Sequence, residues 1–152
     1  MTQQTQAQED MIQTRAQSQM SLAADKVSEV AAQNREVQNI YGGMCHKFPV
    51  LVRTCGLCQA VVFSEMKRAG ANADRSMAHG LLLQHIGALI QSIDPGANGD
   101  PVVAIRAANT SNYIRYTRQI LAGWIYFKRF AVSILEVSDS QAAEADRADG
   151  GA

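Results

Sequence analysis

Residues 111–137 read SNYIRYTRQILAGWIYFKRFAVSILEV and carry the clearest structural signal in this chain of 152 amino acids. Large apolar side chains recur there at intervals of three and four residues, which is the period of one face of an α-helix. This spacing predicts a helix over residues 111–137 with one buried stripe, which other elements of the fold must cover. The predicted stripe consists of Tyr113, Thr117, Ile120, Leu121, Trp124, Phe127, Ala131 and Leu135.

The opposite side of this predicted helix is basic. At about 100° per residue, an arc of about 80° holds Arg115, Arg118, Ala122, Tyr126 and Arg129. The stretch from Pro101 to Leu135 contains no acidic residue and five basic ones, which are Arg106, Arg115, Arg118, Lys128 and Arg129. Exposed faces usually mix both signs of charge. Two interpretations therefore stay open: an ordinary solvated face, or a surface for an anionic partner.

The side chains of this arc indicate which chemical classes of partner it could bind. Arginine binds phosphate through paired hydrogen bonds, and a tyrosine between arginines stacks well on an unpaired base. The same arginines also suit an acidic protein surface, and they do not distinguish RNA from DNA. The pattern is therefore compatible with single-stranded nucleic acid and with an acidic protein.

The net charge of the whole chain conceals this basic segment. Fourteen basic and fourteen acidic residues give a formal net charge of zero. Residues 11–137 hold thirteen basic and eight acidic residues and carry +5, whereas residues 1–10 carry −2 and residues 138–152 carry −3. We predict disorder for the Gln-rich start and for the acidic tail, because neither has periodic apolar positions. A neutral total therefore does not exclude a nucleic-acid partner.

The first half of the chain also has helical periods. A seam of small and apolar residues at heptad spacing predicts a long amphipathic helix, capped at Tyr41-Gly42-Gly43. This seam consists of Ala16, Met20, Ala23, Val27, Val30, Asn34 and Val37. Residues 49–69 are apolar nearly all round, which predicts the central helix of a bundle. The polar arc of that helix consists of Arg53, Gly56, Ala60, Ser64, Lys67 and Arg68.

Turn and cap signals divide the second half of the chain. A third helix is predicted over residues 74–93, with one stripe at Ala78, Leu82, Ile86, Leu89 and Ile93. The turn-rich residues 94–100 end in Asp100, which is predicted to cap a helix starting at Pro101, and residues 110–112 are predicted to form a cap or a kink. We therefore predict an all-α fold, a compact single-domain bundle of about five to six helices over residues 11–137.

Membrane, secreted and enzymatic classes find no support in the sequence. It has no apolar run of about 18 residues and no signal segment, so we expect a cytoplasmic protein without a membrane partner. His46, His79 and His85 do not share a helix face, and the HExxH and GxSxG patterns of zinc proteases and serine hydrolases are missing. We expect no enzymatic activity, no cofactor and no metal.

The three cysteines allow one further possibility. Cys55-Gly56-Leu57-Cys58, with Cys45-His46 upstream, is half of a zinc site, but a second ligand pair is missing. A redox role is disfavoured because the motif is expected in the middle of a helix. Cysteine often behaves as a small core residue, so we interpret both cysteines as part of one buried stripe. The other members of that stripe are Leu51, Val62 and Met66.

Several motifs occur in a fixed order across residues 11–137. They are an opening helix with Arg15; Tyr41-Gly42-Gly43-Met44; Phe48-Pro49-Val50-Leu51 running into Gly56-Leu57-Cys58-Gln59-Ala60 and Phe63; and Tyr113-Ile114-Arg115-Tyr116-Thr117-Arg118 leading into Leu121, Trp124 and Lys128-Arg129-Phe130-Ala131. Together these motifs resemble one family, the small helical subunit of the type III-B CRISPR–Cas effector, also called the Cmr complex.

This resemblance implies a non-catalytic subunit of a guide-RNA-directed antiviral ribonucleoprotein. Copies of it would line up as a minor filament beside the larger backbone subunits and line the channel of the target strand. The implied partners are target RNA, the guide RNA–target duplex, the backbone and large subunits, and neighbouring copies of the same chain. The catalytic centres would belong to the backbone and large subunits.

Eight residues are candidates for RNA contact. Arg115, Arg118 and Arg129 come first, with Lys128 and Tyr126 beside them, because they lie within the acid-free stretch. A second set, Arg53, Lys67 and Arg68, comes from the predicted central helix, and one of the two sets is open to a protein neighbour instead. The alternatives are a helical adaptor that contacts only proteins and a free-standing zinc protein.

Overall fold

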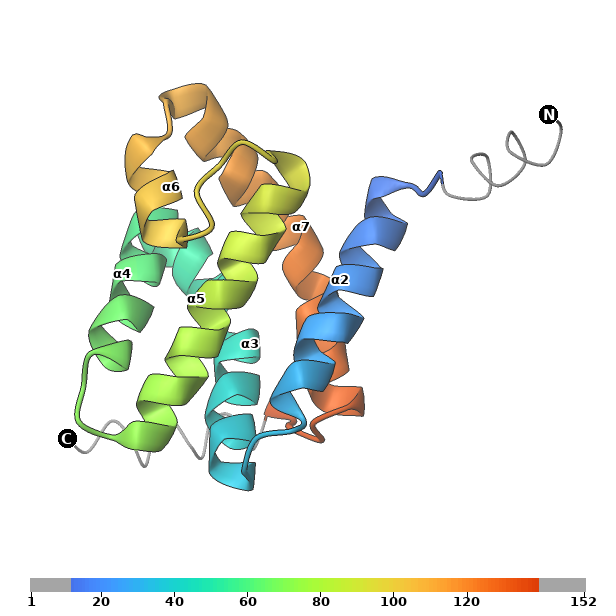
Figure 1. Ribbon diagram of the computed structural model, residues 1–152, viewed down its shortest axis with the longest axis vertical. Helices are drawn as coiled ribbons and strands as arrows, with labels where there is room; N and C mark the ends of the chain where they lie inside the picture. Colours follow the sequence, from blue (N-terminus) through green and yellow to red (C-terminus); the bar gives the residue numbers. More distant parts are fainter. Residues whose placement is uncertain (1–11, 140–152) are drawn as a thin grey trace, which may run out of the picture.

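The computed structural model describes residues 12–139, which form six helices packed side by side without a strand (Figure 1). The predicted all-α class and helix number are confirmed. The predicted disordered start, and the acidic tail except for Ser138 and Asp139, lie outside the described residues. The helices are α2 (Arg15–Val30), α3 (Arg35–Cys55), α4 (Leu57–Arg68), α5 (Ala73–Ile93), α6 (Pro101–Ala107) and α7 (Thr110–Ser133). None of them is both long and apolar enough to cross a bilayer.

Helix α5 is the centre of the bundle and contacts each of the other five described helices (Figure 1). The helix predicted over residues 74–93 is thus confirmed, and its whole predicted stripe is buried. Asn72 caps it by accepting a hydrogen bond from the Arg75 N–H (3.0 Å). Buried side chains also lie outside the stripe, at Leu83 and Ile90. An all-round apolar helix belongs at the centre, and here that helix is α5.

The prediction of one central helix over residues 49–69 is wrong, because the helix is interrupted at Gly56. Gly56 has a φ of 87°, in the left-handed region that favours glycine, and it separates α3 from α4. The break rotates α4, so that Val62 and Met66 are 58% and 60% exposed. Ala60 and Ser64, predicted on the polar arc, are buried instead. The predicted arc therefore does not exist as one surface.

The prediction of one long first helix is also wrong, since the residues of its seam are divided between α2 and α3. Asn34, which the heptad pattern places on the seam, is the N-cap of α3, and its side chain accepts from the Val37 N–H (2.9 Å). Asparagine is a preferred N-cap because it satisfies a free amide of the first turn. Ala16, Met20 and Asn34 are exposed, and the other four seam residues are buried, namely Ala23, Val27, Val30 and Val37.

The predicted cap at Tyr41-Gly42-Gly43 is wrong, because these residues lie inside α3. Helix α7 ends at Ser133, earlier than the predicted residue 137, and Glu136 turns the chain with a φ of 57°. The residues 134–139 that follow α7 lie against α3, and Val137 packs on Gly42. A Cβ added at Gly42 would lie 2.6 Å from the Val137 Cβ. Glycine is needed here for close approach rather than for ending a helix.

We expect Gly42→Ala to lower the free energy of unfolding by about 1–3 kcal/mol, because the new methyl group overlaps the Val137 side chain. In a Val137→Gly background, Gly42→Ala should instead raise the free energy of unfolding. Without the overlap, alanine is a better helix former than glycine by up to about 1 kcal/mol. Urea unfolding of the four chains of this cycle measures both values. Equal losses in the two backgrounds would contradict the contact.

Trp124 joins α7 to an irregularity inside α3. Pro49 has no N–H and cannot donate to the carbonyl of Cys45, its partner one turn earlier in a regular helix. The indole Nε1 of Trp124 donates to that carbonyl instead, at 3.1 Å in the buried core. The Trp124 ring also stacks on Phe127 with centroids 4.4 Å apart and lies 5.0 Å from the Phe48 centroid. This contact fixes how α7 is rotated, and therefore which side chains it exposes.

Candidate nucleic-acid interface

Helix α7 exposes its basic residues because its apolar stripe is held inside. Asn109, just before residues 110–112, caps the helix by accepting from the Asn112 N–H (2.8 Å). Ile120, Trp124, Phe127 and Ala131 of the predicted stripe are buried in α7, Leu135 is buried beyond its end, and Tyr113, Thr117 and Leu121 are half-buried. The four predicted cations of this helix are all exposed, namely Arg115, Arg118, Lys128 and Arg129. The structure places these cations in two separate hollows.

Arg115 and Arg118 share a shallow hollow near the start of α7. It has a volume of about 300 Å³ and is also lined by Ser111, Ile114 and Gln119. The Nη2 of Arg115 donates a hydrogen bond to the Ile93 carbonyl at the C-terminal end of α5, where a cation is favoured by the helix dipole. Part of the Arg115 guanidinium thus has a structural partner, whereas Arg118 is exposed.

Lys128 and Arg129 line a larger groove of about 810 Å³ between α3 and α7, together with Arg53 of α3. Arg53 was predicted to share an arc with Lys67 and Arg68. The break at Gly56 separates it from them and brings it beside the α7 cations instead. Residues Ser138 and Asp139 also line this groove.

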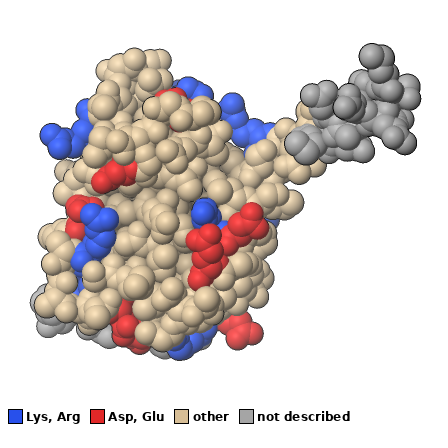
Figure 2. All heavy atoms as spheres, in the orientation of Figure 1, with Lys and Arg blue, Asp and Glu red and all other residues tan. Residues whose placement is uncertain are grey.

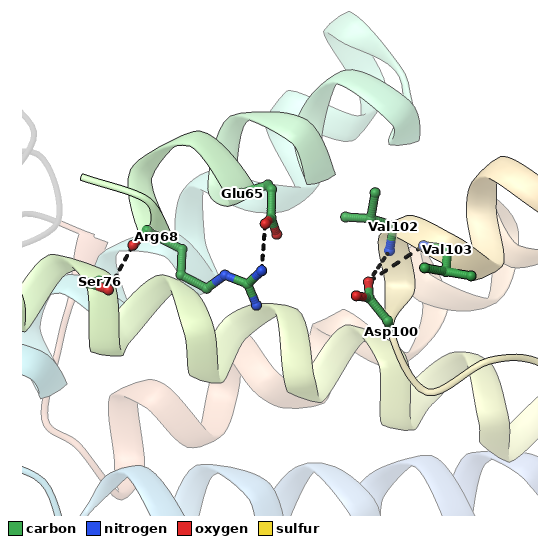
Figure 3. A network of polar contacts seen from close by, with 6 residues as sticks. All are labelled: Glu65, Arg68, Ser76, Asp100, Val102 and Val103. Atoms are coloured by element: carbon green, nitrogen blue, oxygen red, sulfur yellow. Dashed lines mark hydrogen bonds and ion pairs between the residues drawn. The ribbon is translucent and has the colours of Figure 1, made fainter.

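Lys67 and Arg68 lie at the end of α4 and already have neighbours. The Lys67 Nζ lies 5.5 Å from the centroid of the Phe63 ring. The Arg68 guanidinium pairs with Glu65, and the Arg68 carbonyl accepts from the Ser76 hydroxyl at 2.7 Å (Figure 3). Exposed pairs of this kind contribute little to stability, but they do offset the charge that an anionic partner would meet.

Tyr126 is half-buried and packs against the core. Part of its ring is covered, so it is less open to a stacking base than its position on the predicted arc indicates. The exposed arginines are therefore the stronger candidates for contact with a nucleic acid.

The face of the molecule with α2 and α5 in front bears both signs of charge, and its acidic side chains are spread over the face, with one group over α2 (Figure 2). This mixture is typical of a solvated surface. The acid-free stretch of α7 differs from it.

The interpretation of Cys55 and Cys58 as core residues is wrong. Both are exposed, because Cys55 ends α3 and Cys58 lies in the first turn of α4. The Cys58 N–H donates to the Tyr113 hydroxyl (3.2 Å) across the junction. The expected mid-helix position of the motif is wrong for the same reason. Within residues 12–139 no group of three or more histidine, cysteine or acidic side chains is arranged to hold a metal.

The buried titratable groups belong to the core. The Nδ1 of His85 lies 2.7 Å from the Tyr41 hydroxyl, and burial lowers the pKa of His85 to about 4 although Glu29 acts in the opposite direction. Burial, with Lys67, Arg75 and Lys47 nearby, lowers the pKa of His79 to about 4. Burial raises the pKa of the Cys45 thiol far above its usual range. These groups stay neutral near pH 7 and are enclosed by the bundle.

The sequence reasoning missed the aliphatic side chains of the α3–α7 groove. Val50, Ile125 and Val132 line it and are half-exposed. One signal was available, because Ile125 and Val132 are seven residues apart and both lie off the predicted buried stripe. Val50 had no such signal, since the residues that follow it in the sequence are apolar nearly all round.

Comparison with known proteins identifies the family. Residues 15–134 match the family described as CRISPR-associated protein (Cas_Cmr5). The chain is 33% identical over 125 residues to the CRISPR system Cmr subunit Cmr5 of Thermus thermophilus, over 82% of this chain and 99% of that protein. The crystal structure of a CRISPR-associated Cmr5 family protein from the same organism matches with a TM-score of 0.64 and 32% identity, over 81% of this chain and 98% of that one. The chain therefore belongs to the Cmr5 family, the small subunit of the type III-B Cmr CRISPR complex.

Proposed function

We propose that this chain is a non-catalytic subunit that lines the target-RNA channel of the Cmr complex as part of a minor filament. In this role it contacts the phosphates of the target strand and supports the larger subunits beside it. The guide RNA supplies sequence specificity by base pairing, so the protein needs only a surface that attracts backbone phosphates.

The acid-free, exposed side of α7 carries this proposal. Arg118 and the free part of the Arg115 guanidinium lie in one hollow, and none of the residues that line it is acidic. The nearby carboxylate of Asp94, at the end of α5, accepts a hydrogen bond from the Tyr116 hydroxyl. Arginine forms strong, charge-assisted hydrogen bonds with phosphate. Membership in the Cmr5 family supports the same role, because the sequence resemblance implies that the Cmr complex acts on a target RNA.

We expect Arg115→Gln/Arg118→Gln, in the assembled complex, to weaken target-RNA binding by about tenfold or more at low salt. Two lost phosphate contacts should also make the slope of log K against log salt shallower by about 1.4. Filter binding over a salt series measures both quantities. Circular dichroism checks that helicity is retained, since Arg115 also bonds the end of α5.

Two matched variants control this measurement. Arg115→Lys/Arg118→Lys keeps both charges and should largely keep the salt slope. Lys67→Gln/Arg68→Gln removes two charges from α4, where Arg68 already pairs with Glu65, and should change RNA affinity much less. An α7 variant that binds RNA as tightly as the original chain would refute the assignment.

The alternative role is a helical adaptor that contacts only proteins. The aliphatic side chains in the α3–α7 groove favour it, because they suit a protein neighbour better than a nucleic acid. Ultraviolet crosslinking of the complex separates the two roles. Crosslinks from α7 to target RNA favour the channel role, and crosslinks to protein alone favour the adaptor.

A further inference from the structure

The groove between α3 and α7 has an aliphatic floor. Val50 of α3 and Ile125 and Val132 of α7 line it, and they are 56%, 49% and 46% exposed. Half-exposed β-branched side chains that converge from two helices leave apolar area in water, and covering that area is favourable. The groove therefore has a surface that gains from an apolar partner.

The floor is long enough for two turns of a helix. Ile125 and Val132 are seven residues apart on one side of α7, which places them about 10.5 Å apart along the helix axis. Lys128 lies one turn after Ile125, so a cation stands beside the apolar positions. A partner helix that lies along this groove would place apolar side chains at matching intervals of three, four and seven residues.

The rim of the groove is cationic, and its three cations form no ion pairs with residues 12–139. Arg53, Lys128 and Arg129 are exposed, and none of them forms a hydrogen bond or an ion pair with any residue between 12 and 139. One carboxylate of the described chain, that of Asp139, lines the groove, but its Oδ1 lies 2.6 Å from the Nδ1 of His46. Carboxylates or phosphates of a partner would therefore meet these three cations without competing ion pairs from residues 12–139.

The aliphatic floor indicates whether the anionic partner of the groove is a nucleic acid or an acidic protein. Phosphates can pair with the cations of the rim, but a nucleic acid would cover the floor itself only by stacking its bases on exposed aromatic rings. The two aromatic side chains that line this groove, Trp124 and His46, are both buried, and the exposed floor is aliphatic. Carboxylates that flank aliphatic side chains match both the floor and the rim, and that combination is found on an amphipathic helix of a protein.

We propose that the α3–α7 groove is a docking site for an acidic amphipathic helix of another subunit of the complex. Its Leu, Ile or Val side chains cover Val50, Ile125 and Val132, and its Asp or Glu side chains pair with Arg53, Lys128 and Arg129. This assignment goes beyond the RNA-channel role and does not depend on it. It gives the two hollows of α7 different partners, RNA at Arg115 and Arg118 and protein in the groove.

Photo-crosslinking of the assembled complex tests this proposal. The full chain with Ile125→p-benzoylphenylalanine is assembled with the other Cmr subunits and guide RNA, and the crosslinked peptides are identified by mass spectrometry. We expect crosslinks to one other subunit, in a segment with aliphatic residues at helical spacing flanked by Asp or Glu. Crosslinks to RNA, to a second copy of this chain or to residues 140–152 of the same chain would overturn the proposal, as would the absence of crosslinks.

Substitutions then measure the contribution of the floor. Ile125→Asp/Val132→Asp should weaken binding of the crosslinked subunit by about tenfold or more, the size expected for central interface residues. Val103→Asp is the matched control, because Val103 is 43% exposed on α6 and does not line the groove. Equal binding by the groove variant and the control would overturn the proposal.

Charge reversal tests the rim separately. Lys128→Glu should weaken binding of the crosslinked subunit, and a Lys in place of the facing acidic residue of that subunit should restore it. Arg115→Gln/Arg118→Gln should leave this binding unchanged, so that failure of the RNA assignment and failure of the groove assignment give different results. A Lys128→Glu variant with unchanged binding would contradict the charge pairing.

Discussion

Replacing Trp124 with phenylalanine is expected to lower the free energy of unfolding by about 2–4 kcal/mol. The substitution removes the indole N–H that satisfies the buried Cys45 carbonyl, and an unsatisfied buried carbonyl costs about 1–3 kcal/mol. It also leaves a void beside Phe48 and Phe127, because the smaller ring fills less of the core. Urea unfolding, followed by circular dichroism, measures the loss.

The role of Pro49 in this prediction is tested by a double-mutant cycle. Pro49→Ala supplies the N–H that proline lacks, so the Cys45 carbonyl has a donor from its own helix again. Pro49→Ala should therefore be more favourable in the Trp124→Phe chain than in the original chain, by about 1–2 kcal/mol. An identical effect in both backgrounds would mean that the indole N–H does not replace the missing helix donor.

Lowering the pH from about 7.5 to about 5 is expected to cost about 4 kcal/mol of stability, about 2 kcal/mol for each of His79 and His85. The pKa of each is lowered to about 4 in the folded chain, from 6.5. The unfolded chain therefore binds more protons between these two values, and stability falls as the pH drops below about 6.5. Urea midpoints measured across this range give the slope.

The matched variant for this prediction is His79→Gln. It removes one of the two titrating groups, so the loss between the same pH values should shrink to about half. A slope in His79→Gln equal to that of the original chain would contradict the assignment.

Local signals were sufficient for α5, α6 and most of α7. The stripe of α5 repeats at helical spacing, and Asp100 followed by Pro101 marks the start of α6 through its own side chain and ring. The exposed cations of α7 follow from the same spacing, since a buried stripe determines the opposite side. In each case the deciding interaction lies within a few residues of the sequence.

The errors arose where the deciding contact is distant in sequence. Position 42 is a glycine inside a helix because Val137 packs closely on it, and nothing near Gly42 in the sequence indicates that neighbour. Gly56 breaks the chain, whereas the apolar pattern around it predicts a continuous helix. That single break exposes Cys55 and Cys58 and separates Arg53 from Lys67 and Arg68. The α3–α7 groove could not be predicted, because it exists only after these two helices pack.

The most direct test of the proposed RNA-channel role is ultraviolet crosslinking of the reconstituted Cmr complex, with this chain as its small subunit, to labelled target RNA. We predict RNA crosslinks on peptides from the first half of α7, around Arg115 and Arg118, and their loss in Arg115→Gln/Arg118→Gln. RNA crosslinks on the other subunits, with none on α7 of this chain, would contradict the account.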